Sequence, residues 1–158
     1  MIFRKAGVET EWIDCQLSRA EPHMPACDKP FTDLDLILRL LPLCMAGAFA
    51  PYDDSFGMAL AGKGRPSTTA VIFYGQVPEL ARTGYADEQD ILAGVMAHEI
   101  GHLLLGGAHS ATGIMRAKWN REEVKLTGRG QLQFTSEQSL LIRNEVAARL
   151  ARADGRSQ

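Results

Sequence analysis

The chain has 158 residues, of which 46% are hydrophobic and 23% charged, and its formal net charge is -2. This length and composition are typical of one globular domain with a substantial core. The small net charge and the absence of a Lys/Arg-rich run argue against nucleic acid or an anionic membrane surface as a partner. The longest apolar stretch, residues 36–50, contains Arg39 and Pro42 and is too short to span a bilayer.

The first residues resemble the end of a helix. Residues 2–7 read as the last turns of a helix that ends at Gly7. No apolar signal region follows Met1. We therefore expect the natural N-terminus to be longer, with any export signal outside this chain.

The chain contains three cysteines, Cys15, Cys27 and Cys44. Cys15 and Cys27 flank a loop-like stretch with two prolines, and a bridge between them would staple that stretch. The alternative is three unpaired thiols in a reducing compartment. Spacing alone leaves both possibilities open.

Four segments are rich in β-forming or aliphatic residues and predict strands. They are residues 8–14, 34–41, 56–62 and 69–74. We expect residues 16–33 to form a loop between the first two. A short helical turn is expected at residues 77–82, with Pro78 near its start.

A long helix is predicted over residues 87–104. Asp87 is its expected N-cap, and the next residues are acidic, which suits the first turn. Its middle is apolar all round, so we expect it to be buried on most sides. Gly94 and Gly101 each cost about 1 kcal/mol relative to alanine, which suggests that a neighbouring backbone approaches closely. Gly106 and Gly107 should end the helix.

The rest of the chain is predicted to be irregular over residues 108–133 and helical over 135–152. A capping box of Thr135 and Gln138 begins this last helix, and an inward stripe follows it at Ile142, Val146 and Leu150. We predict an α+β fold, with a small twisted mixed sheet packed on the long helix and the C-terminal helix. It forms one domain over residues 1–152, followed by a flexible tail over 153–158.

The long helix carries the run His98-Glu99-Ile100-Gly101-His102, and His109 follows it. Residues four apart lie on one helical face, so His98 and His102 can bind one ion. Glu99 is rotated away from that face and suits a general base. Three imidazoles and a water form an open zinc site. The alternative is a histidine pair in a polar core pocket, which would bury two histidines and a glutamate at considerable cost.

Residues 98–109 resemble the zinc-binding consensus of the metzincin metalloproteases, in which a third histidine completes the site. The segment Thr112-Gly113-Ile114-Met115 is similar to the methionine turn of that family. This chain departs from the consensus, because seven positions rather than six separate His102 from His109. Met115 is also close to His109, and its alternative role is ordinary core packing.

The resemblance implies a zincin-like fold and zinc-dependent peptide hydrolysis. His98, His102 and His109 would hold Zn²⁺, and Glu99 would be the general base. The strand at 57–62 would be an antiparallel edge strand that pairs with an extended peptide or protein substrate. Arg116 is the nearest cationic side chain that could stabilise the oxyanion, although a solvated or structural role is favoured for it. Trp119 is assigned to the core. The resemblance favours export, to the periplasm or outside the cell.

Two alternatives remain open. In a gluzincin-type site, Glu122 or Glu123 on a following helix would replace His109 as the third ligand. In a non-catalytic module, the metal site would help to recognise a peptide without cleaving it. The presence of Glu99 argues against the module, because a purely structural site has no need of a base.

Overall fold

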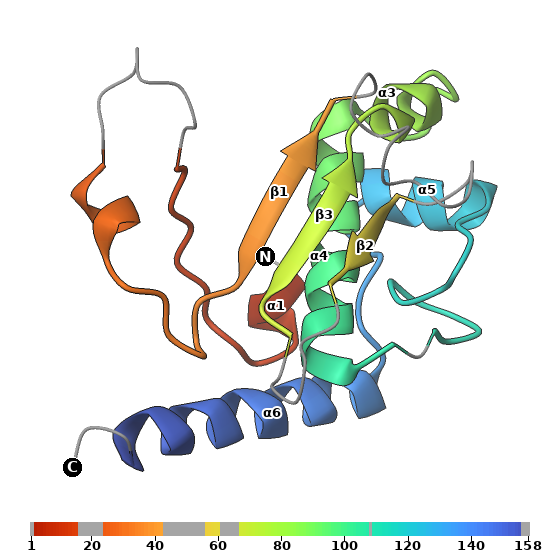
Figure 1. Cartoon of the computed structure of the whole chain (residues 1–158). Helices are drawn as coiled ribbons and strands as arrows, with labels where there is room; N and C mark the ends of the chain where they lie inside the picture. The colour runs from red at the N-terminus through yellow and green to blue at the C-terminus, as the bar shows by residue number, and fades with distance from the viewer. Residues whose placement is uncertain (1, 16–23, 43–55, 61–66, 108, 156–158) are drawn as a thin grey trace.

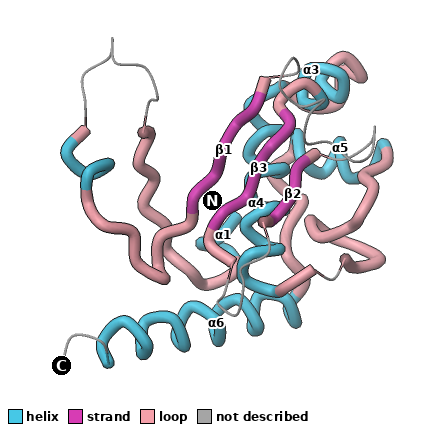
Figure 2. Tube along the Cα trace, viewed as in Figure 1, coloured by secondary structure: helices cyan, strands magenta, loops and turns pink. Residues whose placement is uncertain are grey.

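The computed structural model describes residues 2–15, 24–42, 56–60, 67–107 and 109–155. A small mixed sheet lies beside one long helix, and a second long helix crosses the lower end of the first (Figures 1 and 2). The α+β expectation is confirmed at this level. The helices are α1 (Ile2–Lys5), η1 (Pro25–Asp28, a 3-10 helix), α3 (Gln76–Ala81), α4 (Glu88–Leu105), α5 (Arg121–Gly128) and α6 (Ser136–Gly155). The strands are β1 (Ile37–Leu41), β2 (Gly57–Ala59) and β3 (Thr69–Phe73).

The sheet has the strand order β1-β3-β2 within the described residues. β1 runs parallel to β3, with Leu38 opposite Ala70, whereas β2 runs antiparallel to it, with Met58 opposite Val71. β3 lies in the middle and is buried from its second residue onward, which explains its continuous apolar sequence. The expected antiparallel strand is therefore confirmed over Gly57–Ala59, at the end of the described strand order.

Helix α4 lies at the centre of the packing and contacts β2, β3, α3, α5 and α6. Asp87 caps it, since its side chain accepts a hydrogen bond from the Asp90 N–H, as expected. One core cluster joins α4 to α1, α6 and the segment around Met115, and a second joins it to β3 and α3. A helix with core on two sides needs apolar residues on more than one face, which explains the apolar middle of α4. No helix in the described ranges is both long and apolar enough to cross a membrane.

The N-terminal segment differs from the prediction. Residues 8–14 form no strand, and residues 9–15 are exposed. β-forming residues adopt a strand only where another strand offers backbone partners, and no strand among the described residues pairs with this segment. A disulfide between Cys15 and Cys27 constrains it instead, so the bridged alternative is the one observed. Helix η1 lies within the expected loop, while residues 16–23 and Cys44 lie outside the described residues.

The C-terminal third also corrects two expectations. Residues 108–133 are not wholly irregular, because α5 occupies Arg121–Gly128 behind a capping box of Asn120 and Glu123. The capping box of Thr135 and Gln138 begins α6 as expected. However, α6 continues to Gly155, beyond the expected end at 152. Residues 156–158 of the expected tail lie outside the described residues.

The inward stripe of α6 is interrupted by a buried arginine. Ile142 is fully buried and Val146 partly buried, but Leu150 is 48% exposed whereas Arg149 is only 2% exposed. The Arg149 guanidinium donates to the backbone carbonyls of Leu103 (2.7 Å) and Asp33 (3.1 Å) and pairs with the Glu145 carboxylate (2.8 Å). Arg149 therefore ties α6 to the last turn of α4 and to the segment before β1.

Replacing this arginine should destabilise the fold. Arg149→Met fills similar volume but leaves the buried carbonyls without donors, and we expect a loss of about 3 kcal/mol in the free energy of unfolding. Urea denaturation measures the change. The control is Arg82→Met, which removes an ion pair to Glu79 between side chains that are 70% and 61% exposed and should leave stability nearly unchanged. Equal effects of the two variants would contradict the role assigned to Arg149.

Candidate metal centre

Three histidines converge at the C-terminal half of α4. His98 and His102 lie one turn apart, and their Nε2 atoms are 3.0 Å from each other. Gly106, with φ of +81°, ends the helix in a conformation that favours glycine. The chain then returns, so that His109 Nε2 lies 3.2 Å from His102 Nε2. One ring nitrogen from each histidine lies within 4.8 Å of the others.

Backbone carbonyls determine which ring nitrogens carry protons. His98 Nδ1 lies 2.7 Å from the Ile114 carbonyl oxygen, and His102 Nδ1 lies 3.3 Å from that of Gly106. A carbonyl can only accept, so each Nδ1 must donate. In a neutral imidazole the Nε2 atom then carries a lone pair. The 3.0 Å contact between His98 and His102 therefore brings two lone pairs together.

A cation would turn this repulsion into coordination. Zn–N distances near 2.05 Å in a tetrahedral site place neighbouring ligand nitrogens about 3.3 Å apart. The two measured Nε2 separations, 3.0 and 3.2 Å, are close to that value. The Nδ1–H bonds to carbonyls are also the usual outer contacts of metal-binding histidines. The three residues, whose ligand nitrogens all lie within 4.8 Å of one another, are thus compatible with a bound metal ion.

Burial keeps two of the imidazoles neutral. It lowers the pKa of His98 to about 4, and the neighbouring His102 and His109 add to this, although the bond to Ile114 acts in the opposite direction. Burial also lowers the pKa of His102. His98 is buried, His102 half-buried and His109 exposed. The lone pairs of the first two are consequently available at neutral pH.

Glu99 faces the sheet side of α4. It is 3% exposed, and its Oε2 atom has no hydrogen-bond partner among the described residues. A Cβ added at Gly57 would lie 2.7 Å from the Glu99 Cδ, so glycine in β2 makes room for this carboxyl group. Burial raises the pKa of Glu99 to about 8. Glu99 is thus a buried carboxyl group beside the edge strand, with a proton affinity suited to acid-base chemistry.

A hydrogen-bonded turn closes over the end of the site. The Ser110 N–H donates to the Met115 carbonyl (2.9 Å), and the Ile114 N–H donates to the Gln133 carbonyl (3.0 Å).

Side chains fill the space beside the two glycines of α4. Met115 is fully buried, and its sulfur occupies the space that a side chain at Gly101 would need. The tip of the Trp119 ring likewise occupies the space that a side chain at Gly94 would need. The expectation that a neighbouring backbone approaches these two glycines is therefore wrong, because side chains fill the space at both positions.

The other residues named from the sequence have different partners. Arg116 forms an ion pair with Glu123 at 2.9 Å, and the same carboxylate accepts from the Asn120 N–H. Glu122 pairs with Lys125. Trp119 is partly buried and touches both core clusters, as its core assignment predicts. The structure thus brings His109 rather than either glutamate to the histidine pair.

Sequence reasoning missed several contributors to the site. The carbonyls of Ile114 and Gly106 belong to the backbone and leave no residue-specific signal. Gly57 and Trp119 touch the motif across long sequence separations. The capping box at Asn120 was a readable local signal for α5, which carries Glu123 and packs Val124 in the core cluster that Trp119 contacts.

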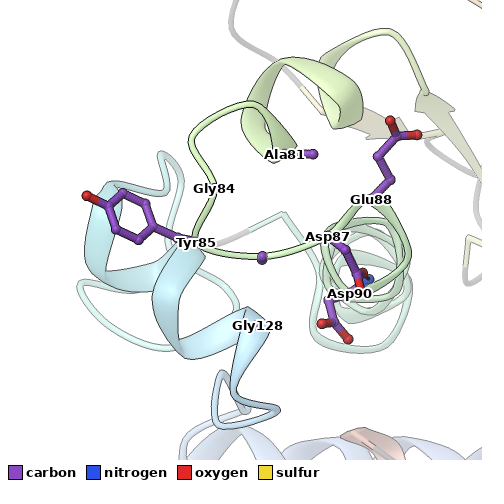
Figure 3. Close-up of a pocket in the computed structure, with 8 residues that line it drawn as sticks. Ala81, Gly84, Tyr85, Asp87, Glu88, Asp90 and Gly128 are labelled. Atoms are coloured by element: carbon purple, nitrogen blue, oxygen red, sulfur yellow. Dashed lines mark hydrogen bonds between the residues drawn. The ribbon is translucent and has the colours of Figure 1, made fainter.

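An open hollow lies elsewhere on α4, at its first turn (Figure 3). It is lined by Ala81, Gly84, Tyr85, Ala86, Asp87, Glu88, Asp90 and Gly128. The Asp87 carboxylate caps the helix, and Glu88 accepts a hydrogen bond from the Tyr74 hydroxyl at 2.9 Å. His98 is ten residues further on, about 15 Å along the axis. The hollow is therefore separate from the histidines.

No family model, curated protein or solved structure matches this chain. Its functional interpretation therefore depends on the motif residues and their geometry. The geometry is compatible with a metal centre of three histidines.

The buried Glu99 predicts a pH dependence for the stability of the metal-free protein. Its folded pKa of about 8 exceeds the ordinary 4.5, so the stability it contributes at low pH is lost as the pH rises toward 8. Burial has the opposite effect on His98, whose pKa falls from 6.5 to about 4. The stability that neutral His98 contributes is therefore lost only as the pH falls from about 6.5 toward 4. From pH 6.5 to 8 the free energy of unfolding should fall by up to about 1.4 kcal/mol per pH unit.

Glu99→Gln should abolish this fall. Urea denaturation with a chelator present, repeated across the pH range, measures the slope for both proteins. An identical slope in the variant would show that the carboxyl group is not responsible.

Proposed function

We propose that this protein is a zinc-dependent metallopeptidase of the metzincin type. The observation that carries the proposal is the convergence of three histidine Nε2 atoms, two of them left unprotonated by backbone acceptors. Imidazole suits zinc, and three such ligands leave a coordination position open. A site with an open position is typical of catalysis rather than of structural support.

The proposed chemistry divides the work between the motif residues. A bound zinc ion would acidify a water and polarise the scissile carbonyl. Glu99 takes the proton of the attacking water on its carboxylate and passes it to the leaving amine. Burial favours this role, because it moves the pKa of Glu99 from the ordinary acidic range toward neutral pH, where a general acid-base group is most effective. His98, His102 and His109 hold the centre in place.

The proposed substrate is an extended peptide or an unfolded segment of a protein. β2 is the last strand in the described order β1-β3-β2, and we expect an extended peptide to align beside it as a further strand. Gly57 lies in this strand and contacts Glu99. A peptide added along β2 would therefore pass beside the proposed base. The Cys15–Cys27 disulfide supports an exported enzyme, since such bonds persist in oxidising compartments.

The third ligand is tested by metal content. Wild-type protein reconstituted with zinc should hold about one ion per chain, and His109→Ala should lose it, because two imidazoles alone bind weakly. Elemental analysis after gel filtration gives both values. The matched controls are Glu122→Gln and Glu123→Gln, which should retain zinc. Retention by His109→Ala with loss in a glutamate variant would favour the gluzincin arrangement.

The base is tested by turnover. Glu99→Gln should keep one zinc per chain and lose activity on a peptide library by at least about a hundredfold. Its zinc content serves as the internal control. Full activity in the variant would refute the role of Glu99. Stoichiometric zinc and peptide binding in the wild type, without cleavage of any peptide, would identify a recognition module instead.

A further inference from the structure

Trp119 shares a hydrogen-bond acceptor with the metal centre. Its indole Nε1–H donates to the Ile114 carbonyl oxygen at 3.2 Å. The same oxygen accepts the Nδ1–H of His98 at 2.7 Å. A carbonyl oxygen has two lone pairs, and these two donors use both of them. The orientation of this carbonyl group is therefore constrained from two sides.

The indole ring is itself held by its surroundings. A Cβ at Gly94 would lie 2.7 Å from Cη2 of Trp119, so only glycine admits the ring at this point of α4. Phe56 packs against it with ring centroids 5.6 Å apart, and the His98 ring meets it edge to face at 6.3 Å. The Nε1–H consequently points in a fixed direction.

We propose that Trp119 is a positioning residue for the metal centre. Its Nε1–H holds the Ile114 carbonyl toward His98, and this carbonyl keeps the His98 proton on Nδ1 and the lone pair on Nε2. The inference rests on the metal site of the proposed function and adds a contact beyond the histidine motif. Loss of an outer contact of this kind commonly lowers metal affinity by about ten- to a hundredfold.

Packing and positioning make different predictions for the loss of the N–H alone. A purely structural tryptophan contributes through its shape, so an isosteric ring without a donor would preserve its role. A positioning tryptophan contributes through Nε1–H, so the same isostere would weaken zinc binding. The chain has two tryptophans, and Trp12 is 57% exposed on the N-terminal segment. Trp12→Phe is thus both a control and a background in which Trp119 alone can be replaced.

The test uses the full chain with Trp12→Phe, in which the remaining tryptophan is replaced biosynthetically by its benzothienyl analogue. The analogue carries sulfur in place of Nε1–H. Zinc affinity is measured by competition with a chelating dye, and the melting temperature of the metal-free protein is recorded. We expect zinc to bind about tenfold more weakly, with little change in that melting temperature. Trp12→Phe alone should match the wild type, and Trp119→Phe should reproduce the loss.

Nitrogen NMR of the histidine rings supplies an independent reading in the metal-free protein. His98 should be the Nδ1–H tautomer in the Trp12→Phe protein and a mixture of tautomers with the analogue. Unchanged zinc affinity, or an unchanged His98 tautomer, overturns the proposal. If the wild type binds no zinc, the proposed function fails, and the tautomer measurement alone then decides whether Trp119 positions His98.

Discussion

Two imidazole lone pairs facing each other at 3.0 Å inside a protein are unfavourable unless a cation lies between them. This constraint explains the arrangement around α4. The carbonyls of Ile114 and Gly106 hold protons on the Nδ1 atoms and so direct the Nε2 atoms toward one another. Burial lowers the pKa of His98, so the ring stays neutral and protonation does not relieve the repulsion. The local structure is therefore arranged to receive a positive charge.

The surrounding elements keep this arrangement rigid. Core clusters on two sides of α4 prevent the helix from rotating. Arg149 binds the Leu103 carbonyl, one residue beyond His102, and fastens the last turn to α6. The turn that contains Ile114 and Met115 is tied to the Gln133 carbonyl. Each contact acts close to a histidine, so the stability of the fold and the geometry of the site depend on the same interactions.

Sequence reasoning succeeded where short-range patterns decide the outcome. The N-cap at Asp87, the capping box at Thr135 and the end of α4 at Gly106 all lie where the residues predict them. The central and edge strands were also predicted, although with longer bounds. The prediction was wrong for residues 8–14, where β-forming residues lack a partner strand, and for Leu150, where Arg149 takes the inward position.

By itself the sequence determined that two histidines share a helical face, that a glutamate lies between them and that glycines end the helix soon after. These are consequences of helical periodicity and capping, which depend on residues within about one turn. Only the tertiary structure decided that His109 joins the pair, that Ile114 and Gly106 supply the acceptors, and that Trp119 shares one of them. These contacts join segments remote in sequence, or use backbone atoms that every residue carries, so their identity emerges only once the chain has packed.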